Sequence, residues 1–170
     1  MTALHGRRVN LHHACYAGSF DPVTLGHTSI VERAARIYER VTVAIGVNPA
    51  KEGMFDRLER QSMIETCVAH LSNVDVQIFD GLLVHFARTI EAGILLRGMR
   101  LLTDFEHELQ LALANRQLAP ELETVFMLTA SEHLHISSSL VKEIARNGGD
   151  FGRFVPPTVE RAIVDKLAKG

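Results

Sequence analysis

The stretch of sequence that decides the fold is HACYAGSFDPVTLGH, residues 13–27. It begins with a short apolar run, His13–Ala17, and continues through a loop that extends from Gly18 to Gly26. From His27 to Arg40 the apolar positions recur every three or four residues. The short run predicts a buried strand and the longer spacing predicts a helix, so the two together are typical of a βα unit.

The loop of this unit has the properties of a phosphate-binding turn. Gly18 and Gly26 let the backbone approach a ligand closely, Ser19 offers a hydroxyl, and the start of the next helix presents unpaired N–H groups with a partial positive charge. The loop is neither the G-x-G-x-x-G of dinucleotide-binding folds nor a P-loop, because it lacks a G-K-[ST] ending. A tight turn without a ligand, with His27 in the first helical turn, explains the same spacing equally well.

The same alternation of short apolar runs and helical spacing continues to the end of the chain. It predicts a Rossmann-like α/β fold, in which a doubly wound sheet of five parallel strands has helices on both faces. Such sheets bind ligands beyond the carboxyl ends of their strands, so we expect the functional residues just after strands. The predicted strands after the first are Val41–Val47, Val74–Phe79, Ile94–Arg97 and Thr124–Thr129. The predicted helices after the first are Arg57–His70, Leu82–Ala92, Thr103–Ala119, Ser138–Asn147 and Thr158–Lys169.

Composition and charge limit the class of protein. The 170 residues, 46% hydrophobic and 22% charged, predict one domain, residues 1–170, of which we expect only residues 1–8 to be flexible. Eighteen Lys and Arg against twenty Asp and Glu give a net charge of −2, which argues against nucleic acid as a partner. No apolar run approaches the roughly 20 residues of a membrane span, and residues 1–13 lack the apolar core of a signal peptide. Cys15 and Cys67 match no zinc-binding spacing and indicate reduced thiols, so we expect a cytoplasmic protein that does not bind membranes.

Basic and hydroxyl side chains follow the predicted strands. Lys51 follows the second strand, Arg97 and Arg100 stand at and after the end of the fourth, and Ser137–Ser139 begin a helix after the fifth. A solvated surface residue explains Lys51 taken alone, and an ordinary helix cap explains any one of the serines. Arg97 ends the apolar run Ile94–Leu96, where a guanidinium needs an anionic partner. Because the carboxyl ends of parallel strands meet at one edge of a sheet, these residues together predict a site for phosphate groups.

Two of these segments also carry the motifs of a known family. Thr24–His27 (TLGH) and Ile136–Lys142 (ISSSLVK) resemble the H-x-G-H-type motif and the I-S-S-[ST]-x-x-[RK] motif of the nucleotidyltransferase superfamily. Within the superfamily the chain is most similar to the bacterial phosphopantetheine adenylyltransferases, which have Thr in place of the first His. The resemblance extends from about Cys15 to the C-terminus, with supporting segments at Ala17–Pro22, Asn48–Lys51, Arg97–Arg100, Thr103–Gln110 and Ser137–Ala145.

The resemblance implies that ATP reacts with 4′-phosphopantetheine to give dephospho-coenzyme A and pyrophosphate, with Mg²⁺, in the penultimate step of coenzyme A synthesis. It also implies a homohexamer that coenzyme A inhibits. His27 is similar to the catalytic histidine that holds the ATP phosphates and stabilises the transition state, and Ser19 matches a residue that touches both substrates. Lys51, Leu83 and Arg97 match positions that bind phosphopantetheine. The other positions that match ATP-binding residues are Phe20, Gly98, Met99, Arg100, Glu108, His133, Leu134, His135, Ile136, Ser137, Ser138 and Ser139.

Such a reaction requires no nucleophile from the protein. A phosphate monoester with a second pKa near ~6 is largely dianionic at pH 7, so it needs placement rather than deprotonation. We therefore expect direct in-line attack on ATP without a covalent enzyme intermediate. Lys51 and Arg97 would place the attacking phosphate, while His27, Arg100, a hydroxyl of Ser137–Ser139 and Mg²⁺ would neutralise the transferring group. Mg²⁺ can be bound mostly by ATP oxygens and water, so no protein residue is predicted as a metal ligand.

Four positions depart from the pattern of that family. Ala17 stands where Pro is usual, His107 and His133 stand where aromatic residues are usual, and His135 stands where Phe is usual. His133 and His135 can still stack on an adenosine or donate a hydrogen bond, and as a pair they could also be half of a metal site. Two other functions stay open, namely a nucleotidyltransferase with a different phosphate acceptor and a non-catalytic sensor of nucleotides or coenzyme A.

Overall fold

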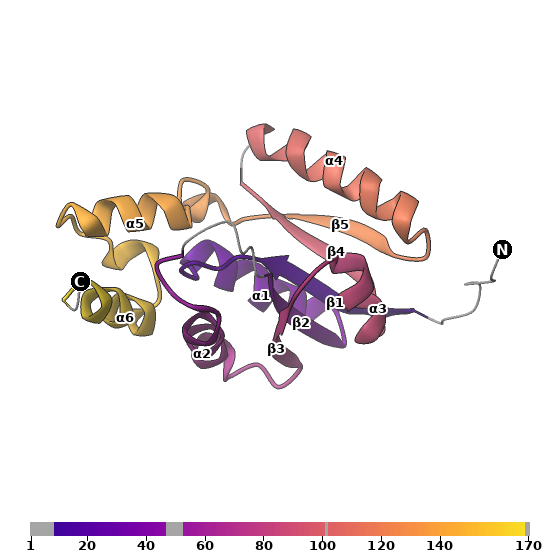
Figure 1. The fold of residues 1–170 in the computed structure, drawn as a ribbon, viewed down its shortest axis with the longest axis horizontal. Helices are drawn as coiled ribbons and strands as arrows, with labels where there is room; N and C mark the ends of the chain where they lie inside the picture. The colour runs from indigo at the N-terminus through magenta and orange to yellow at the C-terminus, as the bar shows by residue number, and fades with distance from the viewer. Residues whose placement is uncertain (1–8, 47–52, 101, 169–170) are drawn as a thin grey trace.

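A computed structural model, which describes residues 9–46, 53–100 and 102–168, places five parallel strands in one sheet (Figure 1). The strands lie in the order β3-β2-β1-β4-β5, so the chain adds β2 and β3 on one side of β1 and then returns to add β4 and β5 on the other. This is the predicted doubly wound arrangement, and the order of the strands reverses between β1 and β4. The strands are β1 Asn10–Gly18, β2 Arg40–Gly46, β3 Val74–Phe79, β4 Ala92–Met99 and β5 Glu123–Leu128.

Helices connect the strands and cover both faces of the sheet (Figure 1). Two short 3₁₀ turns, Ser131–His133 and Gly152–Phe154, lie before and after α5. The predicted stop signal after α5 is confirmed, because Gly148 has the left-handed φ of 71°. The predicted start signal of α6 is confirmed as well, because Pro157 is its first residue. The helices are α1 Leu25–Ile37, α2 Arg57–Val68, α3 Leu83–Thr89, α4 Leu102–Leu118, α5 Ser138–Arg146 and α6 Pro157–Leu167.

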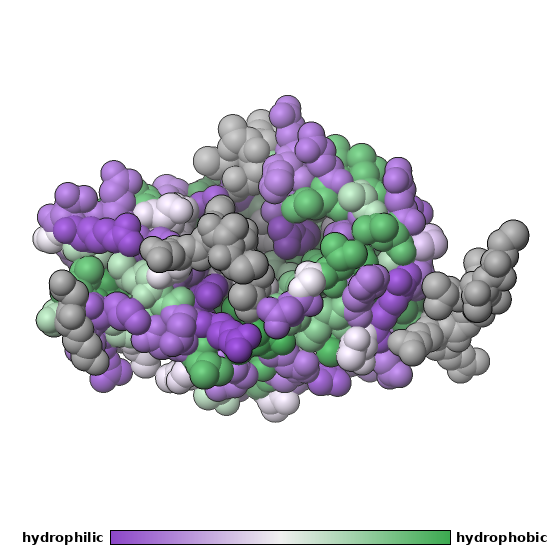
Figure 2. Space-filling view, in the orientation of Figure 1, coloured by the Kyte–Doolittle hydropathy of each residue, from purple (hydrophilic) through white to green (hydrophobic). Residues whose placement is uncertain are grey.

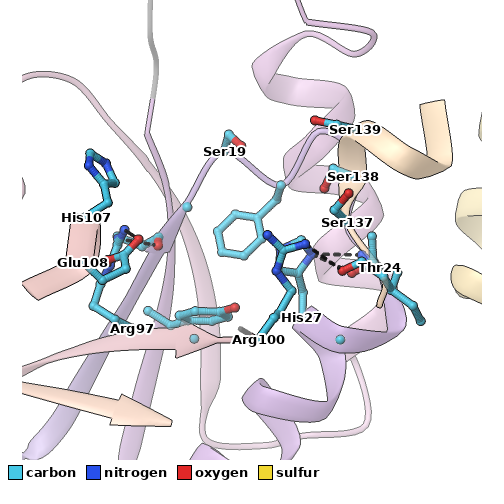
Figure 3. Close-up of a pocket in the computed structure, with 17 residues that line it drawn as sticks. Ser19, Thr24, His27, Arg97, Arg100, His107, Glu108, Ser137, Ser138 and Ser139 are labelled. Carbon is cyan, nitrogen blue, oxygen red and sulfur yellow. Dashed lines mark hydrogen bonds and ion pairs between the residues drawn. The ribbon is translucent and has the colours of Figure 1, made fainter. Parts of the chain in front are cut away.

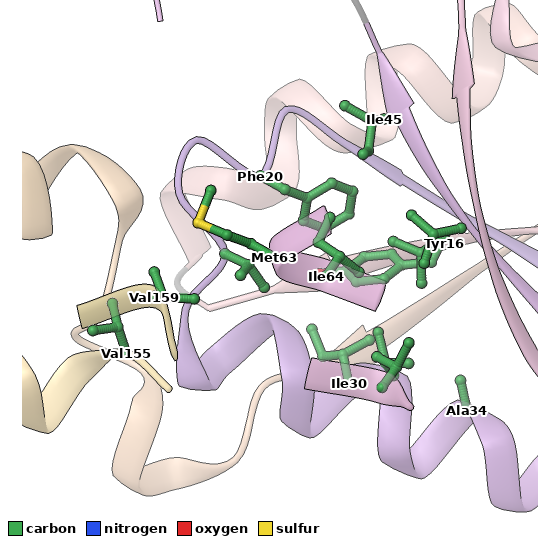
Figure 4. Close-up of a cluster of buried hydrophobic side chains, with 14 of the residues drawn as sticks. Tyr16, Phe20, Ile30, Ala34, Ile45, Met63, Ile64, Val155 and Val159 are labelled. Atoms are coloured by element: carbon green, nitrogen blue, oxygen red, sulfur yellow. The ribbon is translucent and has the colours of Figure 1, made fainter. Parts of the chain in front are cut away.

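Alternate residues of β1 support the two faces of the sheet. Tyr16 packs in an apolar cluster with Ile30 of α1 and Ile64 of α2 (Figure 4). Cys15, the preceding residue, packs on the opposite face in a second cluster that includes Val84 of α3. Because successive side chains of a strand point to opposite faces, β1 is buried on both sides and reads as a continuous apolar run. Each buried aliphatic side chain contributes about 1.5–3 kcal/mol, so these clusters fix the position in which β1 ends.

Two of the predicted boundaries differ from the structure in an informative way. The helix predicted to extend to Ala92 ends at Thr89, because Glu91 has a φ of 57° and Ala92 already begins β4. Gly93 then lies so close to β1 that a Cβ atom there would be 2.7 Å from the carbonyl oxygen of Asn10. Ala92 and Gly93 continue the helical spacing in the sequence, but in the structure their small size allows β4 to lie close to β1. The helix predicted from His27 begins at Leu25 instead, which makes His27 its third residue.

Candidate active site

A cavity of about 420 Å³ opens beyond the carboxyl ends of β1 and β4, where the order of the strands reverses (Figure 3). Doubly wound sheets bind their ligands at this point because the connections of the two strands leave in opposite directions. The starts of α1 and α5 and the first half of α4 complete its wall. The predicted site residues that line the cavity are Ser19, Phe20, His27, Arg97, Gly98, Arg100, Glu108, Ile136, Ser137, Ser138 and Ser139.

The imidazole of His27 is oriented by the residue that precedes α1. The backbone N–H of Thr24 donates a hydrogen bond of 3.0 Å to Nδ1 of His27, and the Thr24 hydroxyl lies 3.0 Å from the same atom. An imidazole here takes the place of the Glu or Gln that reaches back in a capping box. The ring of Phe20 packs edge-on against it, with the ring centroids 5.1 Å apart. Because Nδ1 accepts a backbone N–H, the neutral ring carries its proton on Nε2.

The same surroundings keep His27 neutral. Burial, with a smaller effect of the Arg100 guanidinium, lowers the pKa of His27 to about 4. Every side-chain nitrogen or oxygen that is buried among the described residues has a hydrogen-bond partner. Nε2 of His27 has no such partner among these residues, so it is not buried. Because His27 lines the cavity, Nε2 is accessible from it. At pH 7 His27 therefore offers the cavity one directed N–H donor on a neutral ring.

The start of α5 provides a second set of donors. Ser137 caps the helix, since its hydroxyl oxygen accepts the N–H of Leu140 at 3.1 Å. The Ser138 hydroxyl donates to the carbonyl oxygen of Pro22 at 2.8 Å and so joins α5 to the loop after β1. Ser139 is exposed at the cavity, and within the described ranges its hydroxyl has no partner. The three serines thus divide into two that hold the helix and one that is open to a ligand, and the N–H groups of the first turn add a partial positive charge.

A buried ion pair fixes the loop after β1. The carboxylate of Asp21, only 6% exposed, accepts hydrogen bonds from the backbone N–H groups of Met54 and Phe55 at 3.0 and 2.9 Å. It also accepts one from Nζ of Lys142 in α5 at 2.7 Å. Burial alone would raise the pKa of Asp21, but Lys142 and the two backbone donors outweigh it and hold this pKa below its ordinary value. The sequence predicts no role for Asp21 or Lys142, although both lie within the segments that carry the family resemblance.

The two predicted cations that the structure describes are also held by groups of the chain. Nε and Nη2 of Arg97 donate to the two carboxylate oxygens of Glu108 at 2.5 and 2.7 Å, and Nη1 donates to the carbonyl oxygen of Ala17 at 3.0 Å (Figure 3). Nη1 of Arg100 donates to the carbonyl oxygen of Ile136 at 3.0 Å. These bonds join the end of β4 to α4 and to the segment before α5, so both guanidinium groups have defined positions before a ligand binds.

A second cavity of about 350 Å³ adjoins the first. Ala17, Gly18, Ser19 and Arg97 line both cavities, so the two meet at the end of β1. Its other walls are mainly apolar, and they include Leu83, which was predicted to bind substrate. The residues that give it this character are Phe79, Leu82, Leu83, Leu111 and Ala112. The site as a whole therefore has a polar half and an apolar half with Arg97 between them.

Several predicted site residues lie elsewhere. Met99 is only 8% exposed and lines neither cavity, although its carbonyl oxygen accepts the N–H of Thr129. The stretch His133–His135 also lies outside the walls of both cavities within the described residues, and the His135 ring packs edge-on against Phe154. Lys51 falls outside the residues that the structure describes. In contrast, His107 lines the polar cavity, although no role was assigned to it.

The chain is similar to known proteins over most of its length. Residues 15–144 match the cytidylyltransferase-like family. Phosphopantetheine adenylyltransferases of Synechococcus sp. (strain JA-3-3Ab) and Gloeobacter violaceus are 50% and 51% identical to this chain, and the matches cover 91% of it and 97% and 96% of the two relatives. The chain therefore belongs to the cytidylyltransferase-like family and, within it, to the phosphopantetheine adenylyltransferases, which are nucleotidyltransferase enzymes.

A solved structure shares the fold. It is the crystal structure of a Vibrio parahaemolyticus protein provisionally assigned as a nicotinate-nucleotide adenylyltransferase, with a TM-score of 0.67 over 90% of this chain and 91% of that one. The identity is 18%, so this likeness concerns the arrangement of the sheet and helices alone.

The ion pair of Asp21 predicts a large effect on stability. Asp21→Asn keeps the size of the side chain but leaves Lys142, whose side chain is 21% exposed, without its counter-ion. We expect the free energy of unfolding, measured by urea denaturation at pH 7, to fall by roughly 2–4 kcal/mol. Asp80→Asn is the matched control, because the Asp80 side chain is 71% exposed and lies 3.9 Å from Arg57. Equal losses in the two variants would show that the Asp21 pair does not hold the loop.

The neutral state of His27 predicts a dependence of stability on pH. The unfolded chain takes up a proton on His27 near pH 6.5, whereas the folded chain does so only near a pKa of about 4. Stability from this residue is therefore complete above about pH 6.5 and falls as the pH decreases toward 4. Gln is the usual capping-box residue at this helix position and does not titrate, so His27→Gln is a suitable comparison.

We expect the wild-type free energy of unfolding to fall between pH 7 and pH 5 by on the order of 1 kcal/mol more than that of His27→Gln. The measurement is urea denaturation at both pH values. If wild type and variant lost the same amount, His27 would have an ordinary pKa in the folded protein.

Proposed function

We propose that this chain transfers the adenylyl group of ATP to 4′-phosphopantetheine, which gives dephospho-coenzyme A and pyrophosphate. The observation that carries the proposal is the meeting of a polar and an apolar cavity at Ser19 and Arg97. Two helix N-termini and the His27 N–H suit the phosphates of ATP, while the apolar cavity suits the uncharged pantetheine arm. Arg97 lies between the two, where the phosphate of the acceptor would meet the α-phosphorus.

In the proposed reaction an oxygen of the acceptor phosphate forms a bond to the α-phosphorus of ATP. The bond from that phosphorus to the bridging oxygen breaks at the same time, and pyrophosphate leaves with the electron pair. The attacking phosphate is already largely dianionic at pH 7, so no general base is needed. The task of the protein is to place the two phosphates and to stabilise the charge that develops between them.

Each residue of the polar cavity has a role in this proposal. The Nε2–H of His27 donates to an oxygen of the α-phosphate, and it strengthens as negative charge develops there. Arg100, the Ser139 hydroxyl and the N–H groups that begin α5 bind the leaving pyrophosphate. Arg97 binds the acceptor phosphate, and Lys51 is proposed to assist it.

Mg²⁺ is proposed as the cofactor, and when bound it neutralises charge on the triphosphate. In the part of the chain that the structure describes, no group of three or more His, Cys, Asp or Glu side chains is placed to hold a metal ion. Glu108, the carboxylate in the polar cavity, is bound to Arg97. A triphosphate and water can supply most of the oxygen ligands that Mg²⁺ requires, and the Ser139 hydroxyl, which lines the polar cavity, could supply a further one.

The proposal extends to assembly and regulation. Large apolar side chains gather over α3 and α4 (Figure 2), and Leu82, Leu113 and Leu118 are each more than half exposed. Such a surface supports association between copies of the chain, for which we propose the homohexamer. Coenzyme A combines a pantetheine arm with an adenosine diphosphate, so it would occupy both cavities and inhibit the enzyme.

We place the enzyme in the cytoplasm, with its two cysteines as free thiols. Among the described residues, no helix combines the length and the hydropathy that a membrane crossing requires.

Pyrophosphate release tests the proposed function. We expect release only when ATP, 4′-phosphopantetheine and Mg²⁺ are all present. Release with nicotinamide mononucleotide or a sugar phosphate in place of 4′-phosphopantetheine would instead identify a relative with another acceptor. Binding of ATP or coenzyme A without any release would identify a sensor.

His27 provides a test of the role of a single donor. Removing one oriented donor to the transition state costs about 10²–10³ in rate, so we expect His27→Ala to lower kcat by that factor and to change the KM for ATP much less. His70→Ala is the control, because His70 lies on the surface beside Glu32 with its side chain 60% exposed. A kcat of His27→Ala within twofold of wild type would exclude the proposed role.

A further inference from the structure

The guanidinium of Arg97 is held in one orientation by three hydrogen bonds. A guanidinium has five N–H groups. Glu108 accepts two of them, from Nε and Nη2, and the Ala17 carbonyl oxygen accepts a third, from Nη1. Two N–H groups of Arg97 therefore stay open among the described residues, one on each terminal nitrogen. These neighbouring nitrogens lie where the polar and apolar cavities meet, and a phosphate can accept from both.

Glu108 is occupied by this arrangement. Both of its carboxylate oxygens accept from Arg97, and its side chain is only 15% exposed. It is carried by α4, whereas Arg97 is in β4, so the pair also fixes the helix relative to the strand. Figure 3 shows the two side chains facing each other at the edge of the cavity, away from His27 and the serines of α5. Both oxygens are directed at the guanidinium, so a hydroxyl of ATP could reach only a second lone pair on an oxygen that already accepts from Arg97.

We propose that Glu108 is a positioning residue for the acceptor and acts through Arg97. By holding the Nε edge of Arg97, it directs the two open N–H groups toward the acceptor phosphate. This inference rests on the proposed function, and it gives Glu108 a different role from the ATP contact that its match to the family implies. The same carboxylate lies near the incoming phosphate and repels it. Orientation of Arg97 by Glu108 therefore strengthens binding of the acceptor, whereas the negative charge of Glu108 weakens it.

The change that Glu108→Gln makes in the KM for 4′-phosphopantetheine distinguishes orientation of Arg97 from repulsion of the phosphate. The amide keeps the size of the side chain, but its NH₂ group faces an N–H of Arg97 instead of accepting it. If orientation dominates, Arg97 turns away and the KM for 4′-phosphopantetheine rises. If the carboxylate only repels the phosphate, the cavity becomes more positive and the same KM falls.

The experiment compares Glu108→Gln, Arg97→Ala and the double variant by steady-state pyrophosphate release, with each substrate varied in turn. We expect Glu108→Gln to raise the KM for 4′-phosphopantetheine on the order of tenfold, the usual effect of losing a charged hydrogen bond. The KM for ATP should stay within twofold. We expect Arg97→Ala to raise the acceptor KM at least as much, and the double variant should match Arg97→Ala, because Glu108 then has nothing to position.

Two further variants control the comparison. Glu106→Gln makes the same chemical change on an exposed residue of α4 that lines neither cavity, and we expect it to behave as wild type. Glu108→Asp keeps the charge but shortens the side chain by one methylene, so an orienting role predicts an acceptor KM between those of wild type and Glu108→Gln. The midpoint of thermal unfolding of each variant shows whether it is folded, and Glu108→Asp serves as the test if Glu108→Gln does not fold.

Three results would overturn the inference. They are a lowered acceptor KM in Glu108→Gln, a raised KM for ATP with the acceptor KM unchanged, and additive effects of Glu108→Gln and Arg97→Ala. Failure of the proposed function itself is distinguishable, because the wild-type protein would then release no pyrophosphate with these two substrates.

Discussion

The reversal of strand order between β1 and β4 is the constraint on which the rest of the structure depends. The connection that leaves β1 continues to α1, and the connection that leaves β4 continues to α4, on opposite faces of the sheet. The carboxyl ends of these neighbouring strands are therefore not covered by either connection. Two helix N-termini and two arginines converge there, although α1 begins at Leu25 and α5 only at Ser138.

The residues at this opening are ordered by partners within the chain. Thr24 orients His27, Glu108 and Ala17 orient Arg97, and the carbonyl oxygen of Ile136 orients Arg100. Such groups need little reorganisation when phosphates arrive, and this is how fixed dipoles stabilise a transition state more than water does. The proposed reaction requires placement of two phosphates and stabilisation of the charge that develops between them, so a site without a protein nucleophile is sufficient for it.

Much of the fold could be predicted from the sequence because its signals are local. For the strand Val74–Phe79, the predicted first and last residues are those of the structure. The left-handed turn at Gly148 follows from the pair Gly148-Gly149. The end of α3 is not predictable in this way. Ala92 continues the helical spacing, and only pairing with β1, which the local sequence does not contain, assigns it to a strand.

In the candidate site, too, local motifs could be predicted from the sequence, whereas contacts between distant segments could not. The motifs identify His27 and Ser137–Ser139, and the structure brings them to one cavity with Arg97. Their partners could not be predicted, since Lys142 lies 121 positions from Asp21 and Ser138 lies 116 positions from Pro22. The state of the His27 ring depends on a helix that begins at Leu25, two residues earlier than its apolar spacing indicates.

We propose that this opening brings two phosphates together so that one attacks the other directly. The stereochemical course at the α-phosphorus tests it, with ATP made chiral at that atom by one sulfur in place of an oxygen. A single in-line displacement predicts that the adenylylated product has the inverted configuration. Retention of configuration would require two successive displacements through an adenylylated side chain of the protein, and it would contradict the account.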